Sequence, residues 1–266
     1  MFQLNKIMTQ LGLEIDERVI NNLAKRYCTL DYSVTLIKHL QNIYPTEQLE
    51  NFSKYELHKL LNEVLVQYYN GEEILKYKLA EKHLKQRSIV GAFEMKVNNS
   101  RVDFIAVNGV STSYEIKSEL DNLSKLSKQM SDYMLAFEYN YLIIDQIHME
   151  KAKDLLPVNF GLWCYKNGKY RTLQKAKLNK KIDPEMQLRL LTKKELISCY
   201  PEKQGNIKKI LNTYKASSIN DLFKETLKNR YRDRWKFLIS NKENIFPIDI
   251  QFFFNTNILP ERIYRH

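Results

Sequence analysis

Apolar residues recur at two different spacings along the chain, which separates a helical region from a mixed one. Over residues 1–70 the spacing is that of helices. Ser53 and Glu56 form a capping box, which predicts the start of the best-defined helix. The apolar positions behind it are Leu57, Leu60, Leu61, Val64 and Leu65. Asn70-Gly71 then predicts a break in the helical pattern.

The middle of the chain alternates between helical and strand-like patterns. A helix is expected over 72–86, and another along the apolar stripe from Leu120 to Phe137. Asn108-Gly109 and Asn167-Gly168 predict hairpin turns. The strand-like runs are Ala92–Val97, Arg101–Val107, Ser111–Ile116, Tyr141–Ile144, Leu162–Tyr165 and Tyr170–Leu173. The order α-β-β-β-α-β, with an appended helix and hairpin, predicts an α/β fold with a mixed sheet flanked by helices.

The last part of the chain is expected to be helical. Asp183 followed by Pro184 is typical of a helix start, and Thr192 with Glu195 forms a second capping box. A basic helix is expected to open near Ser218. The predicted regions are a helical one over 1–70, an α/β core over 71–175 and a basic helical one over 176–266.

The composition is that of a soluble globular protein. Of the 266 residues, 44% are hydrophobic and 27% are charged. No apolar run reaches the roughly 18 residues that a membrane helix needs, and the N-terminus lacks the apolar stretch of a signal peptide. We therefore expect no membrane association and a cytoplasmic location. Cys28, Cys164 and Cys199 are too few and too scattered for a disulfide framework or a zinc site.

Positive charge is concentrated toward the C-terminus. Residues 1–165 carry 19 Lys and Arg against 21 Asp and Glu, a net charge of −2. Residues 166–266 carry 23 against 10, a net charge of +13, which together give the chain's +11. This asymmetry favours a surface that binds a polyanion. A solvated lysine-rich face has the same composition, so charge alone leaves both interpretations open.

Candidate chemistry lies in the hairpin around Asn108-Gly109. Side chains alternate along a strand, so Glu115 and Lys117 share one face while Ile116 points to the other and suits the core. Asp103 on the preceding strand joins the pair if the register allows it.

The register that unites these residues can be stated in advance. If Val107 opposes Ser111, Asp103 opposes Glu115, and residues directly opposite share a face. This requires a three-residue loop of residues 108–110 with Gly109 in the left-handed conformation. A two-residue turn would instead set Asp103 opposite Tyr114 and split the site.

Carboxylates held close together repel each other, and their burial is costly without a compensating cation. Mg²⁺ is such a cation, because it binds one or two carboxylates together with water and substrate phosphate oxygens. It activates a water molecule and neutralises charge on the scissile phosphate, while a lysine stabilises the developing negative charge. Asp103, Glu115 and Lys117 therefore predict a magnesium-dependent nuclease, in which Mn²⁺ substitutes for Mg²⁺.

The arrangement resembles the PD-(D/E)XK phosphodiesterase superfamily, also known as restriction-endonuclease-like. The residues that carry the resemblance are Val102-Asp103 and, eleven residues later, Glu115-Ile116-Lys117. Gln129 and Tyr133 resemble the Gln-x3-Tyr motif of the RecB-type branch. They are four residues apart and share a helix face. Val102 stands where the family name has proline, a position that only shapes the strand. The run 114–121 is similar to a small group of bacterial and phage-encoded members.

The resemblance covers about residues 72–165 and implies a restriction-endonuclease-like core that cleaves DNA. It implies metal ligation by Asp103, Glu115 and the Ile116 carbonyl, with Gln129 and Tyr133 near the substrate or the metal-bound water. DNA repair, recombination, phage and defence settings all fit, and many relatives act as dimers, so a homodimer is a possible form.

The superfamily usually adds an upstream acid. Glu73 and Glu94 are favoured for this role, with Glu81 as a competitor, although an ordinary exposed glutamate is an equal interpretation of each. Arg101 is a candidate phosphate contact, against the alternative of a solvated arginine.

Bases and aromatic residues interleave over residues 229–237. Arg230, Arg232, Arg234 and Lys236 are candidates for binding a nucleic-acid backbone. An amphipathic helix that buries Tyr231, Trp235 and Leu238 has the same pattern, so both interpretations stay open.

Two other functions remain as alternatives. A nucleic-acid-binding or scaffold protein on a catalytically degenerate nuclease fold explains the basic segment, although intact carboxylates argue against it. A ribonuclease has the same sequence features as a deoxyribonuclease.

Overall fold

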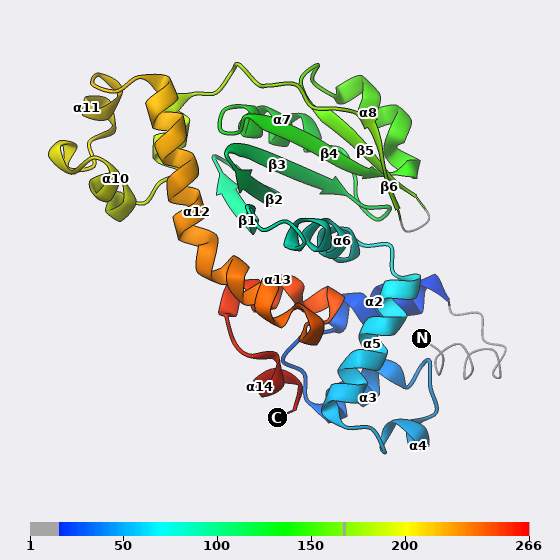
Figure 1. Cartoon of the computed structure of the whole chain (residues 1–266). Coiled ribbons are helices and arrows are strands. Elements are labelled where there is room, and N and C mark those ends of the chain that lie inside the picture. The colour runs from blue at the N-terminus through cyan, green and yellow to red at the C-terminus, as the bar shows by residue number, and fades with distance from the viewer. Residues whose placement is uncertain (1–15, 167–168, 266) are drawn as a thin grey trace. The chain divides into compact units, whose positions relative to one another are not determined.

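The computed structural model describes residues 16–166 and 169–265. The described chain forms two compact units, one made from the residues up to Tyr77 together with those from Phe237 onward, the other from Lys78–Lys236. The division falls within two helices, α6 (Glu72–Leu84) and α12 (Ala216–Asn241), which are labelled in Figure 1. The units do not coincide with the three regions expected from the sequence, because residues 237–266 join the beginning of the chain.

The first unit is helical. Helix α5 (Lys54–Tyr68) begins directly after Ser53, whose hydroxyl and backbone form the predicted capping box with Glu56. Further helical segments of this unit are α2 (Glu17–Arg26), α3 (Ser33–Leu40), α4 (Thr46–Leu49), η3 (Lys242–Asn244), η4 (Pro247–Asp249), α13 (Ile250–Thr256) and α14 (Pro260–Tyr264).

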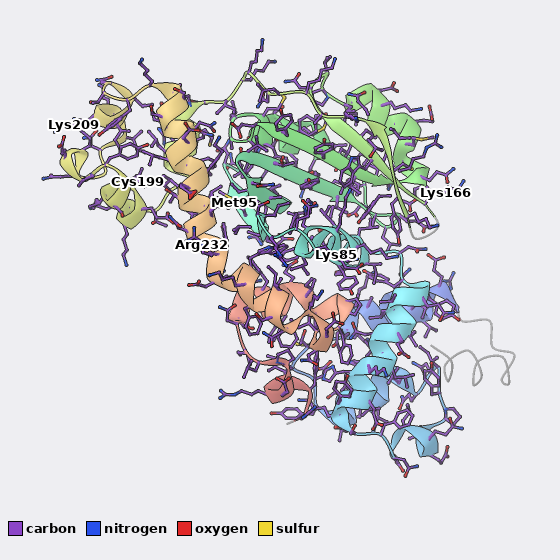
Figure 2. All side chains as sticks on the ribbon, viewed as in Figure 1. Lys85, Met95, Lys166, Cys199, Lys209 and Arg232 are labelled. Carbon is purple, nitrogen blue, oxygen red and sulfur yellow. The ribbon has the colours of Figure 1, made fainter. Side chains whose placement is uncertain are left out.

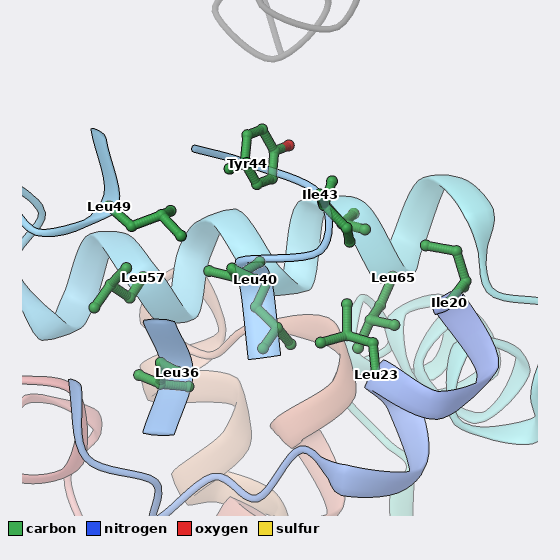
Figure 3. Close-up of a cluster of buried hydrophobic side chains, with 11 residues drawn as sticks. Ile20, Leu23, Leu36, Leu40, Ile43, Tyr44, Leu49, Leu57 and Leu65 are labelled. Carbon is green, nitrogen blue, oxygen red and sulfur yellow. The ribbon is translucent and has the colours of Figure 1, made fainter. Parts of the chain in front are cut away.

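The core of the first unit is a cluster of buried aliphatic side chains. Figure 3 shows Leu36 and Leu40 of α3 beside Leu57 and Leu65 of α5, and all four are fully buried. Burial of each such side chain contributes about 1.5–3 kcal/mol relative to an exposed position. The apolar residues whose spacing predicts α5 are therefore residues that α5 contributes to this core.

The second unit is built on a six-stranded mixed sheet with the order β1-β2-β3-β4-β5-β6. The β3–β4 and β4–β5 pairs are parallel, and the other neighbours are antiparallel. The strands are β1 (Val90–Val97), β2 (Ser100–Asn108), β3 (Val110–Lys117), β4 (Tyr139–Asp145), β5 (Gly161–Lys166) and β6 (Lys169–Gln174). All six expected strands and the α/β class are confirmed. The expected Asn167-Gly168 turn lies outside the described residues.

One face of the sheet carries aromatic side chains. Phe104 of β2, Tyr114 of β3 and Tyr141 of β4 lie on successive strands of this face. Trp163 of β5 contacts both tyrosine rings. The His83 ring of α6 stacks on Phe104 with centroids 5.5 Å apart. Trp235 of α12 also contacts Phe104, at 5.8 Å. The α6 and α12 residues of this unit thus cover one face of the sheet.

The opposite face is covered by α7 (Leu126–Met134) and α8 (Met149–Leu155). A short 3₁₀ helix, η1 (Gln146–His148), directly precedes α8. The shared core contains Leu126, Met130, Leu142, Ile144, Ala152, Phe160 and Leu162. Since Leu142 aligns with Glu115 in the parallel register, Glu115 lies on this α7 face.

Helix α7 is shorter than expected, so the prediction of one helical stripe from Leu120 to Phe137 is wrong at both ends. Leu120 is 46% exposed. Ser118 donates to Asp121 through both its backbone N–H and its hydroxyl, and Ser124 does the same to Asn122. Such local side-chain bonds compete with helical hydrogen bonding, so the helix starts only at Leu126.

Short helices lead from the sheet to α12. The predicted starts at Asp183 and Thr192 are confirmed as side-chain caps, and α12 begins at Ala216, two residues before the expected Ser218. These segments are α9 (Pro184–Arg189), α10 (Lys193–Cys199), η2 (Pro201–Lys203) and α11 (Ile207–Leu211). None of the described helices combines the length and apolar composition that a membrane crossing requires. The three cysteines are free thiols.

Candidate active site

The β2–β3 hairpin has the register that unites the candidate residues. Val107 pairs with Ser111, and the ladder continues to Phe104 opposite Tyr114. The next step along both strands brings Asp103 level with Glu115. Asn108 pairs with Val110, and Gly109 makes the turn with a φ of +69°, in the left-handed region that glycine adopts readily.

Asp103 is fixed against the backbone of β3. Its carboxylate accepts a hydrogen bond from the Ile116 N–H, with Oδ2 2.6 Å from the nitrogen. Ile116 itself is fully buried, as its place between the two charged residues predicts. The Asp103 carboxylate is therefore held beside the Glu115–Lys117 segment, on the same face.

Glu115 and Lys117 form a buried ion pair. The Lys117 Nζ lies 2.5 Å from Glu115 Oε1, the Glu115 side chain is fully buried, and that of Lys117 is 11% exposed. Burial works to lower the pKa of Lys117, but the adjacent Glu115, with smaller effects of Asp103 and Asp121, raises it above its usual value. The lysine thus stands as a fixed positive charge next to two carboxylates.

Tyr133 reaches the same carboxylate from α7. Its hydroxyl lies 2.6 Å from Glu115 Oε2 and 2.8 Å from the carbonyl oxygen of Arg101, and it can donate to only one of them at a time. Burial, then the charge of Glu115, raises the pKa of Tyr133 far above its usual value. The group therefore acts as a hydrogen-bond donor and not as a base.

Gln129 lies one helical turn before Tyr133, on the same face of α7, and its side chain contacts the Tyr133 hydroxyl. The Oε1 atom of Gln129 is buried and has no hydrogen-bond partner among the described residues. A buried amide oxygen without a partner is costly, so this atom is suited to accept a hydrogen bond from a bound ligand or water.

Glu94 is held in an unusual backbone conformation on β1. Its φ is +55°, although it lies between the regular pairs Phe93–Phe104 and Met95–Val102. A carboxylate oxygen of Glu94 comes within 4.8 Å of one of Asp103, and Arg101 Nε lies 3.8 Å from Glu94 Oε2. Residues in the left-handed region cluster at functional sites, because the rest of the fold must hold them there.

Residues 67–253 match the model of the family described as bacteriophage P4 protein cII. The chain belongs to this family. The matched segment includes the whole sheet and every residue of the candidate site. A search of curated proteins gave no match. Among solved structures, a protein of unknown function from Silicibacter pomeroyi is 19% identical over 54% of this chain and 92% of that chain, with a TM-score of 0.34. That likeness is too low to carry an argument.

The other two acidic candidates in this cII-family chain are exposed residues of α6. Glu73 is exposed in the first turn of α6, within the first unit. Glu81, further along α6, is exposed and pairs with Lys85, 3.2 Å away. Of the upstream acids considered from the sequence, Glu94 is the one that the second unit brings to Asp103.

The basic segment of α12 divides into structural and exposed residues. Arg230 is bound by Glu195, with Nε 2.7 Å from Oε1 and Nη2 2.5 Å from Oε2, so it joins α12 to α10. Trp235 is fully buried, which supports the amphipathic interpretation at that position. Arg234 and Lys236 are exposed, and Arg232 is half-buried.

Asp121 is a residue beside the site that the sequence reasoning did not include. It accepts hydrogen bonds from the backbone N–H and the hydroxyl of Ser118, directly after Lys117. Its charge also helps to raise the pKa of Lys117. The Ser-x-x-Asp spacing after Lys117 is the signal that could have indicated this turn.

Proposed function

We propose that this cII-family chain is a metal-dependent nuclease of the PD-(D/E)XK type, with a restriction-endonuclease-like core. The observation that carries the proposal is the hairpin cluster: Asp103 is bonded to the Ile116 N–H, next to the buried Glu115–Lys117 pair. A surface salt bridge requires neither full burial of the glutamate nor a second carboxylate beside it.

The donor set suits a hard divalent cation. Asp103 and Glu94 bring carboxylate oxygens within 4.8 Å of each other, and Glu115 is level with Asp103 in the β2–β3 ladder. Carboxylate oxygens are the ligands that Mg²⁺ and Mn²⁺ prefer. Gln129 Oε1, which has no hydrogen-bond partner in the described part of the chain, adds a buried acceptor beside Tyr133. When bound, such an ion lowers the pKa of a water molecule and offsets charge on a phosphate. Asp103, Glu115, Glu94 and the Ile116 carbonyl are the groups proposed to hold it.

The chain's own residues supply the remaining parts of the mechanism. The Lys117 ammonium lies where it would stabilise negative charge that develops on a scissile phosphate. Tyr133 and Gln129 orient Glu115 and the groups around it through their hydrogen bonds. DNA is the proposed substrate, and the positive charge beyond residue 165 favours its binding.

A carboxylate-to-amide change at Asp103 tests this function. Asp103→Asn keeps an oxygen that can accept the Ile116 N–H bond but removes the negative charge. We expect cleavage to fall by a factor on the order of 10² or more, and Mn²⁺ binding, followed by calorimetry, to be lost with it. The assay compares single-stranded, duplex and branched DNA, and RNA, with Mg²⁺ or Mn²⁺ and with a chelator.

Glu81→Gln is the matched control, since it neutralises an exposed acid of the same unit, and it should cleave like the unchanged protein. Nucleic-acid binding without cleavage by the unchanged protein under either metal would instead favour the scaffold function. Equal cleavage by Asp103→Asn and the unchanged protein would remove the hairpin from the mechanism.

A further inference from the structure

A pocket of about 500 Å³ opens in the second unit, between β1, the segment around α9, and α12. Its walls include Met95, Lys96, Arg189, Leu190, Arg230 and Tyr231. Figure 2 labels Met95 on β1 and Arg232, which directly follows the pocket-lining residues of α12. This volume is within the range of about 300–1,000 Å³ that small-molecule sites occupy.

The lining combines positive charge, an aromatic ring and apolar surface. Lys96 is exposed, and Arg189 is exposed although it pairs with Glu185 on the same helix. Surface ion pairs of this kind are weak, so Arg189 remains accessible to a stronger anionic partner. Met95 and Leu190 supply apolar surface. These are the features that bind a planar ring carrying a phosphate.

Arg230 and Tyr231 form a rigid part of the wall. The Arg230 guanidinium is fixed by Glu195 and by the Leu190 carbonyl oxygen, 3.0 Å away, and its central carbon lies 5.7 Å from the Tyr231 ring centroid. The half-buried ring is therefore held in place before any ligand binds, which reduces the entropy lost on binding.

The pocket and the candidate site share strand β1, which carries Glu94 of the site and Met95 and Lys96 of the pocket wall. Met95 and Lys96 directly follow Glu94, roughly 3–7 Å along the strand. Lys96 lies opposite Arg101 in the β1–β2 ladder, and the Arg101 side chain lies near the Glu94 carboxylate. A strand of nucleic acid whose phosphate occupied the carboxylate cluster would thus bring a neighbouring nucleotide to the pocket.

We infer that this pocket binds one unpaired nucleotide of a single-stranded nucleic-acid substrate, with the base on Tyr231 and the phosphate near Lys96 and Arg189. The inference rests on the proposed nuclease function for its identification of the ligand as substrate. An unpaired base is required, because a base within a duplex is stacked on its neighbours and cannot lie on a protein ring.

Binding is measured without catalysis, in the full-length Asp103→Asn protein with a chelator, by fluorescence anisotropy of labelled oligodeoxythymidylate. Tyr231→Ala should weaken binding roughly 5- to 150-fold, the factor that loss of one stacked base gives. Tyr231→Phe keeps the ring and should bind nearly as the parent does. Lys96→Glu, at an exposed position, should also weaken binding and lower its dependence on salt.

Lys209→Glu makes the same charge change at an exposed position of α11, outside the pocket, and serves as the control. The inference predicts a larger loss for Lys96→Glu than for Lys209→Glu. Equal losses for the two, with Tyr231→Ala binding like Tyr231→Phe, would overturn it, and so would stronger binding of a duplex of the same length. This assay measures binding and no cleavage, so the two proposals can fail separately. If the nuclease proposal alone is wrong, the protein binds the single strand as described here but shows no activity in the cleavage assay.

Discussion

At the scale of single residues, the candidate site depends on which groups compensate the negative charge of the buried Glu115 carboxylate. The Lys117 ammonium contacts one of its oxygens and the Tyr133 hydroxyl the other. Removing one partner of a buried ion pair leaves an uncompensated charge and costs about 3–5 kcal/mol. If the carboxylates bind a divalent ion, that ion compensates part of the negative charge of Glu115.

Lys117→Met tests this exchange, because it removes the charge and keeps most of the side-chain volume. In a chelator we expect the free energy of unfolding to fall by about 3 kcal/mol. Saturating Mn²⁺ should restore more stability in Lys117→Met than in the unchanged protein, while cleavage falls by a factor on the order of 10². Urea denaturation with and without Mn²⁺ measures the first effect, and a cleavage assay the second.

The matched control is Lys85→Met, which breaks the exposed pair with Glu81. Exposed pairs contribute about 0–1 kcal/mol, so its stability should barely change, and Mn²⁺ should affect it as it affects the unchanged protein. A loss in Lys117→Met that Mn²⁺ does not reduce, with cleavage retained, would mean that Lys117 is only a structural ion-pair partner.

At the scale of elements, β1 is interrupted at the residue that faces the hairpin cluster. Pairing with β2 is regular at Phe93 and again at Met95, but Glu94 between them has a φ of +55°. A residue with a Cβ in this conformation costs roughly 1–2 kcal/mol, a cost that glycine avoids. The strand therefore holds the Glu94 carboxylate near Asp103 at the expense of its own stability.

Replacing Glu94 by glycine or by alanine separates strain from metal binding. Both variants lose the carboxylate, so both should bind Mn²⁺ more weakly than the unchanged protein in calorimetry. Only glycine suits the backbone, so Glu94→Gly should be more stable than Glu94→Ala by about 1 kcal/mol in urea denaturation. Equal stabilities would show that the strand relaxes without strain. Unchanged Mn²⁺ affinity in both would remove Glu94 from the metal ligands.

The elements that could be predicted from the sequence are those defined by local signals. Asn108-Gly109 located the turn between β2 and β3, but the sequence left two registers open, and the structure has the one that pairs Val107 with Ser111. Helix starts such as Ser53 and Thr192 follow from their capping boxes. The left-handed conformation of Glu94 could not be predicted, since glutamate rarely adopts it and tertiary packing imposes it. The late start of α7 was missed because the side-chain bonds of Ser118 compete with a helix that the apolar pattern favours.

At the scale of the whole molecule, the contribution of the last thirty or so residues to the first unit could not be predicted from local patterns. The sequence groups residues 237–266 with the basic helices before them, whereas in the structure they pack with the N-terminal helices. Contacts between residues that are far apart in sequence decide this, and apolar spacing does not reveal them. One buried group that links residues 237–265 to the N-terminal helical segments is the carboxyl of Asp249.

Asp249 is fully buried and is surrounded by hydroxyl groups from distant segments. The Thr29 hydroxyl lies 2.7 Å from Oδ1, and those of Tyr27 and Tyr264 lie 2.9 and 2.7 Å from Oδ2. Tyr27 also lies 2.9 Å from Nδ1 of His58. If Tyr27 donates to Asp249, His58 must carry its proton on Nδ1 to complete the contact.

Burial raises the pKa of Asp249 to about 6, although the hydrogen bonds from Tyr264, Thr29 and Tyr27 oppose the rise. The folded protein therefore binds this proton more tightly than the unfolded chain, whose aspartates titrate near pH 3.9. The stabilisation that this gives is complete below the unfolded-state pKa and is lost as the pH rises through about 6.

Asp249→Asn tests the sign of this effect, because asparagine is neutral at every pH and retains an acceptor oxygen. Between about pH 4 and pH 7, the unchanged protein should lose about 2–3 kcal/mol of stability relative to Asp249→Asn, as two pKa units correspond to about that energy. Taking this difference removes the contribution of His58, whose pKa burial lowers to about 4 and which changes stability in the opposite direction. Urea denaturation of both proteins across the range measures it. If the unchanged protein instead gains stability relative to Asp249→Asn as the pH rises, the three hydroxyl groups stabilise an ionised carboxylate. Hydrogen bonding would then outweigh burial in setting the pKa of Asp249.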